Sequence, residues 1–181
     1  MKNLTVEQIV KLFKKHRPET LHDVFELGID LVATDKPGRI TMQCIGKGSY
    51  RRAYRINNLP LIVKFPCGED DSVSPQECLE HACNEIHAWT LLKGKYKKLK
   101  KYCPEVYFMD EMTGVILMKE YDNCKPKGHN EIKRKASEEI EKVTDKGLDF
   151  YKNFVCDKDG NVTLLDWGLL GELTEWEEVE T

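Results

Sequence analysis

The sequence predicts an α+β fold in which a five-stranded antiparallel sheet is crossed by one helix. First, apolar residues recur at every second position after Pro37-Gly38, which is typical of strands. Second, a strongly capped helix begins at Ser74, after the third predicted strand. Third, a strand pair, a helical segment and a final short hairpin follow this helix in that order.

The composition fits one soluble folded domain and disfavours several classes of function. The chain has 181 residues, with 28 Lys and Arg against 31 Asp and Glu, so its net charge of −3 gives no general attraction for nucleic acid or anionic lipid. No apolar run approaches the roughly 20 residues of a membrane span, and the first residues lack the apolar core of a secretory signal. The seven cysteines include no Cys-x-x-Cys pair, which favours reduced thiols over a zinc site. We therefore expect a cytoplasmic protein.

Residues 1–36 are expected to form a helical extension. Thr5 and Gln8 form a capping box, after which apolar residues recur at helical spacing. This helix is expected to end before Pro18, because the residue preceding a proline avoids the helical region. A second helix is expected over 19–31. The two helices could form a partner-binding arm or pack against their own domain, and we favour packing.

The remaining elements follow from periodicity and from helix and turn signals. Ser74, Pro75 and Glu77 make a strong helix start, and this helix is expected to end at Gly94. A further helix is expected over 131–143. The five strands of the sheet are expected at 39–44, 53–56, 59–65, 106–109 and 115–118, with a glycine-containing turn over 45–50 and a terminal hairpin formed by 154–156 and 162–165.

Glycines and one lysine in the first three strands are candidates for binding phosphate. Gly46 and Gly48 flank Lys47 in the expected turn, although glycines in hairpins usually serve backbone geometry. Lys64 is a charged residue at the end of the most apolar strand. It could snorkel from a sheet edge, or it could direct an ammonium at phosphates while Glu85, in the capped helix, holds it in place.

Two oxygen-bearing side chains are expected at one end of the terminal hairpin. Asp166 follows a buried strand, where a carboxylate is costly unless it is paired or bound to a cation. Asn153 precedes the partner strand, and amide and carboxylate oxygens are ligands that suit Mg²⁺. The sequence therefore predicts a metal site at Asn153 and Asp166. The alternative is that Asp166 caps the next turn.

Taken in order, these residues resemble the protein-kinase-like family over about residues 39–170. The resemblance implies a kinase-like N-lobe over 37–121, a rudimentary C-lobe (one helix and a β-hairpin) over 122–170 and an acidic tail over 171–181. It implies that ATP contacts Gly46, Lys47, Gly48, Ser49, Lys64 and the backbone at Glu120 and Tyr121. It also implies that Glu85 orients Lys64, and that Asn153 and Asp166 hold Mg²⁺.

The sequence departs from the family pattern in three places. Arg51 and Ala53 stand where the family has its third loop glycine and the following valine, so the turn is expected to cover phosphates less closely and to carry extra positive charge. The residue five positions before Asn153, where the family has its catalytic base, is Leu148. Asp149 and Asp145 are the nearest candidates to replace that base. The chain is also too short after Gly168 for a full activation segment, as in shortened kinase-like proteins of bacterial effectors and phages.

The sequence therefore favours an ATP- and Mg²⁺-dependent phosphotransferase, a minimal Ser/Thr-type protein kinase that needs a protein partner to position its substrate. The lysine-rich segment Lys93–Lys101 could dock that partner, although we favour a solvated turn, and we expect neither membrane nor dedicated nucleic-acid binding. Leu148 favours the alternative, a pseudokinase that binds nucleotide or protein without phosphoryl transfer. A small-molecule kinase of the aminoglycoside-phosphotransferase type is less favoured, because it needs a larger C-terminal lobe.

Overall fold

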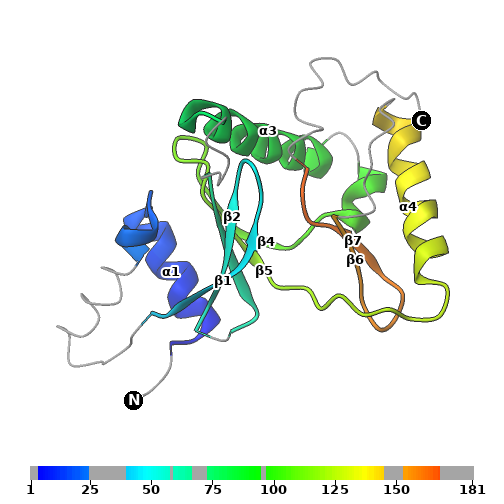
Figure 1. Cartoon of the computed structure of the whole chain (residues 1–181), viewed down its shortest axis with the longest axis horizontal. Helices are drawn as coiled ribbons and strands as arrows, with labels where there is room; N and C mark the ends of the chain where they lie inside the picture. Colours follow the sequence, from blue (N-terminus) through cyan, green and yellow to red (C-terminus); the bar gives the residue numbers. More distant parts are fainter. Residues whose placement is uncertain are drawn as a thin grey trace. The chain divides into compact units, whose positions relative to one another are not determined.

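The computed structural model describes residues 4–24, 40–57, 59–66, 73–94, 97–144 and 153–167, and it confirms the α+β fold class (Figure 1). The chain divides into two compact units, the first formed by Met1–Cys83 and Glu105–Glu120 and the second by Asn84–Pro104 and Tyr121–Thr181. The boundary falls inside one helix, α3 (Pro75–Gly94). None of the helices in the described ranges is long and apolar enough to cross a membrane.

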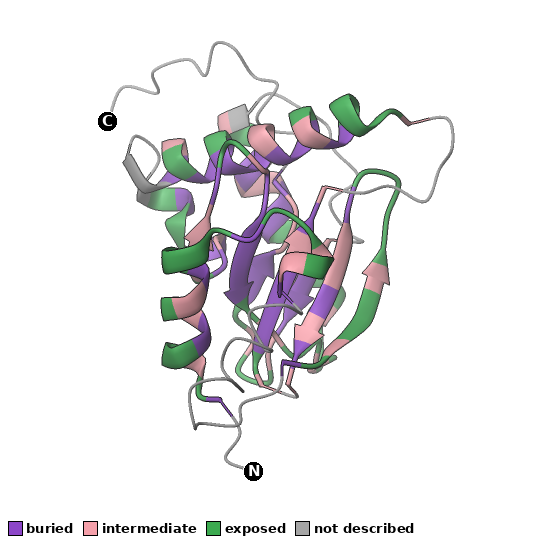
Figure 2. Cartoon of the chain, turned by 90° about the vertical axis from the view of Figure 1, so that its left-hand side faces the viewer, coloured by how far each residue is buried: buried purple, intermediate pink, exposed green. Residues whose placement is uncertain are grey.

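The first unit contains a five-stranded antiparallel sheet in the order β1-β2-β3-β5-β4. Its strands are β1 (Met42–Lys47), β2 (Arg52–Ile56), β3 (Leu61–Phe65), β4 (Val106–Met109) and β5 (Ile116–Lys119). The central strands β3 and β5 are almost entirely buried, whereas the edge strand β1 is mostly exposed (Figure 2). The sheet therefore has the strand number and the antiparallel pairing that the sequence predicts.

The first strand differs from the expectation in its bounds. Ile45 was expected in the turn, but β1 continues to Lys47, with an irregular register between Cys44 and Gly46. Cys44, the last residue of the expected strand, is exposed. The reason is that β1 is an edge strand, so its side chains lack the packing that a central strand receives. The six cysteines within the described residues are free thiols, and two of them are buried.

The first helix, α1 (Val6–His16), packs on one face of this sheet. Ile9 and Phe13 are fully buried, in one cluster with strand residues such as Val63, and the Phe13 ring meets that of Phe108 edge-on at 5.9 Å. The predicted capping box is present, since Gln8 N–H donates to the Thr5 hydroxyl and the Gln8 side chain accepts from Thr5 N–H. α1 thus packs against its own unit, as we favoured. Of the second expected helix, residues 19–24 are described, and 21–24 of these are helical.

The helix α3 begins as the sequence predicts. Ser74 N–H donates to the Glu77 carboxylate at 2.7 Å, and Glu77 N–H donates to the Ser74 hydroxyl at 3.2 Å. These reciprocal bonds satisfy two main-chain donors that the first turn of a helix leaves unpaired. Because the hydroxyl and the carboxylate cap each other's main chain, they fix the start of α3 at Pro75.

The second unit has a core of its own, built from helices and one hairpin. It contains α4 (His129–Thr144), the 3₁₀ helix η1 (Lys97–Tyr102) and the hairpin of β6 (Phe154–Cys156) and β7 (Val162–Leu164). Ile140 of α4 packs with Phe154 and with the fully buried Trp167. The expected one helix and one hairpin of the C-terminal part are therefore present in the described residues.

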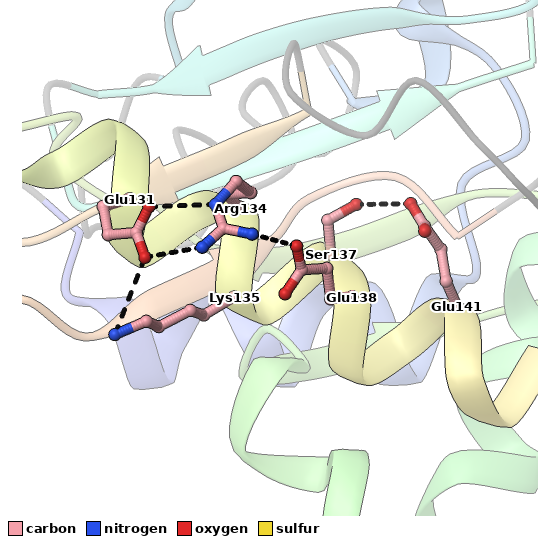
Figure 3. A network of polar contacts seen from close by, with 6 residues as sticks. All are labelled: Glu131, Arg134, Lys135, Ser137, Glu138 and Glu141. Atoms are coloured by element: carbon pink, nitrogen blue, oxygen red, sulfur yellow. Dashed lines mark hydrogen bonds and ion pairs between the residues drawn. The ribbon is translucent and has the colours of Figure 1, made fainter.

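Another side of α4, on which Glu131, Arg134 and Lys135 are exposed, carries a network of ion pairs and hydrogen bonds (Figure 3). Next to it, the buried Ser137 donates to the Glu141 carboxylate at 2.9 Å. Arg134 bridges Glu131, at 2.7 Å, and Glu138, and these acids raise the pKa of the guanidinium. Partners three and four residues apart lie on one side of a helix, so these pairs support α4 itself.

Residues 97–101 of the lysine-rich segment lie in η1, which is tied to α4. Lys101 Nζ and the Tyr102 hydroxyl both donate to the Glu139 carboxylate, at 2.9 and 2.6 Å. These two donors lower the pKa of Glu139. Part of the basic charge in this segment therefore serves contacts within the second unit. The glutamate-rich tail, 172–180, lies outside the described residues.

Candidate functional site

Lys64 lies in the middle of the first unit's sheet. It pairs with Ala53 on β2 and Ile116 on β5, and Ala53 in turn pairs with Gly46 on β1. Since β3 has a neighbouring strand on each side, the alternative that Lys64 snorkels from a sheet edge is wrong. Directly opposed residues point to the same face of a sheet, and strands lie about 4.8 Å apart, so Gly46 stands about 10 Å from Lys64 on the same face.

Gly46, Ala53 and Lys64 form a row of paired residues across β1, β2 and β3. In this row, the side chains on the β1 side of Lys64 are small. Gly46 has no side chain, and a Cβ placed on it would lie 3.7 Å from the Ala53 methyl. Toward the other end of the strands, the same face carries the buried side chains of Ile62 and Met118. The residues beside Lys64 on this face are therefore small or apolar, a composition that suits a ligand with a flat apolar part and an anionic part.

An ion pair borders these residues. Arg55, opposite Ile62, directs its Nε to both carboxylate oxygens of Glu120, at 2.9 and 2.8 Å. Glu120 N–H donates to the Pro60 carbonyl at 2.9 Å, so this donor is already used within the sheet. The sequence analysis did not identify Arg55. The signal was present, because Arg55 lies two residues from Ala53 and hence on the same face of the strand.

The glycine turn is short and closed. Gly48 N–H donates to the Arg51 carbonyl at 2.9 Å, and Lys47, Gly48 and Ser49 are exposed. Arg51 itself is buried, and its guanidinium donates to the Gly114 carbonyl at 2.9 Å. The expectation that Arg51 adds positive charge to the open turn is therefore wrong. Its side chain packs inward because the β4–β5 turn offers it a carbonyl acceptor.

Glu85 is a buried carboxylate on α3, with 3% of its surface exposed. Taking a carboxylate out of water is costly unless it is paired, so its burial fits a residue that holds a cation. Glu85 belongs to the second unit and Lys64 to the first. The pairing of these two residues stays a prediction.

The terminal hairpin brings the two predicted metal ligands to one end. Phe154 pairs with Leu164, and Leu165 N–H donates to the Asn153 carbonyl at 2.9 Å. Asn153, directly before β6, is therefore paired with Leu165, and Asp166 directly follows Leu165, so both residues stand at the same end of the hairpin and both are half-buried.

Neighbouring side chains hold this end of the hairpin. Lys133 of α4 is buried and its Nζ donates to the Phe154 carbonyl at 2.6 Å. The Trp167 indole N–H donates to the Leu164 carbonyl at 2.9 Å. Each contact involves the residue next to Asn153 or Asp166, so the positions of these two residues depend on a few identifiable groups.

The donor set fits Mg²⁺ better than a metal held entirely by protein. No cluster of three or more His, Cys, Asp or Glu side chains suited to a metal occurs within the described residues. Mg²⁺ usually keeps several waters and takes one or two protein oxygens together with substrate phosphates, which is what one amide and one carboxylate can supply. At the far end of the hairpin, Asp157 is occupied with its own turn. The Asn161 side chain and main-chain N–H groups donate to it and lower its pKa.

Two predicted residues lie outside the described part of the chain. Asp145 and Asp149, the candidates for the catalytic base, fall in the range 145–152. Tyr121, expected to contact nucleotide through its backbone, is half-buried at the start of the second unit's main segment. The roles of all three stay predictions.

No protein-family model and no curated protein matches the sequence. Among solved structures, the chain is similar to the Rio2 kinase–ADP/Mg²⁺–phosphoaspartate complex from Chaetomium thermophilum, with 13% identity and a TM-score of 0.47, over 90% of this chain and 61% of that one. It is also similar to the streptomycin–ATP–APH(2")-IIa ternary complex, with 17% identity and a TM-score of 0.35, over 88% of this chain and 48% of that one. The chain thus spans less than two thirds of either relative. At these values the similarities assign neither a family nor an activity.

Proposed function

We propose that the protein is an ATP- and Mg²⁺-dependent phosphotransferase, a minimal Ser/Thr-type protein kinase that acts in the cytoplasm on a substrate presented by a protein partner. The observation that carries the proposal is the hairpin register, which puts Asn153 and Asp166 at the same end of the hairpin. The face of the sheet around Lys64 supports it, because that face suits a nucleotide base and its phosphates.

Each predicted residue then has a role. Lys64 contacts the α- and β-phosphates, and Glu85 orients it. The turn residues Gly46, Lys47, Gly48 and Ser49 lie close to the phosphates, and the backbone at Glu120 and Tyr121 contacts the base. Asn153 and Asp166 hold Mg²⁺, which neutralises charge on the phosphates when it is bound. Asp149 or Asp145 accepts the proton of the substrate hydroxyl.

Leu148 favours a second candidate function. A leucine cannot accept a proton, and it stands where the kinase-like pattern places the base. The alternative is therefore a pseudokinase that uses the same residues to bind nucleotide, or that binds a protein partner, without transferring phosphate.

The decisive experiment measures nucleotide binding and phosphoryl transfer with the same set of variants. We expect ATP with Mg²⁺ to raise the melting temperature, since a ligand that binds only the folded state stabilises it. Labelled γ-phosphate should be transferred to the chain itself or to a lysate protein. Lys64→Met and Asp166→Asn should remove the transfer. Asp159→Asn, at the exposed far end of the same hairpin, is the matched control.

The outcomes separate the candidates. An unchanged melting temperature at millimolar ATP and Mg²⁺ would contradict both nucleotide functions. If ATP raises the melting temperature of the wild-type protein but neither wild type nor any variant transfers phosphate, the result would support the pseudokinase. Where transfer occurs, Asp149→Asn and Asp145→Asn show which aspartate replaces the missing base, and two unimpaired variants would contradict both assignments.

A further inference from the structure

The turn between β1 and β2 is fixed at its tip by an aromatic stack. The rings of Tyr50 and His81 are parallel within 4°, with their centroids 4.5 Å apart. Tyr50 is 38% exposed, whereas His81, on α3, is buried. A tyrosine at an exposed turn loses side-chain freedom when it is held in one position, so the stack must offset that cost.

The residue after Tyr50 makes a second attachment, to a different element. Arg51 is buried, and its guanidinium donates to the Gly114 carbonyl in the β4–β5 turn. The main-chain carbonyl of Arg51 also accepts the Gly48 N–H that closes the glycine turn. The Arg51 side chain therefore connects the glycine turn to the β4–β5 turn, and the Arg51 backbone closes the glycine turn itself.

The β4–β5 turn also packs closely against α3. Gly114 has a φ of +67°, and a Cβ placed there would lie 2.7 Å from the Ala82 Cβ, so only glycine fits this approach. The Cys83 thiol donates to the Glu111 carbonyl at 3.2 Å, a second contact between the same two elements. The glycine turn, the start of α3 and the β4–β5 turn thus meet within the first unit.

We propose that Tyr50 and Arg51 are positioning residues, which fasten the glycine turn to α3 and to the β4–β5 turn and so hold its backbone N–H groups in place for phosphate. The fastening rests on the observed contacts, whereas its use for phosphate rests on the proposed function. A turn held in one conformation before binding loses less conformational entropy when the ligand arrives. Arg51 stands where the kinase-like pattern has a third glycine, so this chain has a fastened turn where that pattern has a freer one.

Backbone amide exchange tests the fastening without any nucleotide. Tyr50→Leu removes the aromatic stack but keeps an apolar side chain. We expect exchange at Gly48 to rise about three- to tenfold, the range that corresponds to the loss of one aromatic pair. Exchange at Val63 and Leu117, in the central strands, should not change. Tyr50→Phe keeps the ring and should restore slow exchange. Equal exchange in wild type and Tyr50→Leu would overturn the proposal, as would a rise that also reaches the central strands.

Arg51→Met is a second variant. Because Arg51 is buried, its replacement also tests folding, so the Tyr50 variants decide between the outcomes. If the wild-type protein shows measurable phosphoryl transfer, Tyr50→Leu should raise the KM for ATP about three- to tenfold and leave kcat within about twofold of the wild-type value. Met112→Ala, an exposed residue of the β4–β5 turn, is the control and should change neither. Faster exchange with an unchanged KM would overturn the role toward phosphate. If wild type binds no nucleotide but the exchange result holds, the fastening stands and the proposed function fails.

Discussion

The two units hold their candidate polar residues in different ways. Lys64 occupies a central strand, where hydrogen-bonded neighbours on both sides set its position. Asn153 and Asp166 stand at the end of a hairpin whose strands are three residues long. The position of Lys64 therefore depends on the register of a whole sheet. The positions of Asn153 and Asp166 depend on a few side chains, so the second unit should be more sensitive to single substitutions near its candidate site.

The largest expected effect tests this difference at Trp167. Trp167→Ala removes a fully buried indole and its hydrogen bond to Leu164, and should lower the free energy of unfolding by about 3–5 kcal/mol. Amide exchange at Leu165 should rise with it, because the indole packs at the end of the hairpin. Chemical denaturation and amide exchange measure the two effects.

Phe13→Ala is the matched control in the first unit, since Phe13 is also fully buried. Its cost in unfolding free energy should be similar, but exchange at Lys64 should rise less than exchange at Leu165 does in Trp167→Ala, because neighbouring strands hold Lys64 on both sides. If amide exchange at Lys64 in Phe13→Ala rises as much as exchange at Leu165 in Trp167→Ala, the contrast between the two units is wrong.

Two glycines with positive φ sharpen the comparison. Gly114, in the first unit, has a φ of +67° and no room for a methyl group, whereas Gly128, in the second unit, has a φ of +79° and nothing within 4 Å of an added Cβ. Gly128→Ala should cost about 1 kcal/mol of backbone strain. Gly114→Ala adds a steric clash and should cost about 2–4 kcal/mol. Urea denaturation of both variants measures the difference. An equal loss of unfolding free energy in the two variants would show that the β4–β5 turn can shift to accommodate a methyl group.

Local sequence patterns predicted much of this architecture. The capping box of Ser74 and Glu77 fixed the start of α3, because its hydrogen bonds join residues three apart. The position of Asn153 and Asp166 at one end of the terminal hairpin also followed from the two short strands and the turn between them. These features depend on neighbours in the chain, so periodicity and turn chemistry were sufficient to predict them.

The contacts that the sequence analysis missed join distant segments. Arg51 and Gly114 are 63 residues apart, and Arg55 and Glu120 are 65 residues apart. No local pattern distinguishes an arginine that packs inward from one that faces water. The extension of β1 to Lys47 was missed for a related reason, since a glycine after an alternating run also signals a turn.

Lys133 is predicted to affect the hairpin more than overall stability. Lys133→Met removes the donor to the Phe154 carbonyl and should cost about 1 kcal/mol, because the unpaired carbonyl is partly offset by the relief of a buried charge. Exchange at Leu165 should rise. Lys135→Met, on the exposed face of α4 (Figure 3), is the control and should stay within about 0.5 kcal/mol of wild type. A hairpin that exchanges at the wild-type rate in Lys133→Met would show that Lys133 is dispensable for holding it.

The smallest expected effect is a pH dependence of stability that arises from Asp110 in the first unit. Burial by itself would raise the pKa of Asp110, but hydrogen bonds from the Arg17 guanidinium and from main-chain N–H groups lower it below its usual value of 3.8. The folded state therefore binds fewer protons than the unfolded state near that pH. This contribution to stability is complete above the unfolded pKa and is lost as the pH falls through the folded pKa.

Arg17→Met removes one of these donors and should bring the folded pKa of Asp110 closer to its unfolded value. The free energy of unfolding, measured by urea denaturation at a series of pH values from about 7 to 3, should then fall less steeply on the acid side than in wild type. Tyr102→Phe is the counterpart in the second unit, since the Tyr102 hydroxyl is the main group that lowers the pKa of Glu139. Parallel curves for wild type and Arg17→Met would show that the main-chain donors alone hold Asp110 ionised, and that α1 adds nothing to the acid stability of its unit.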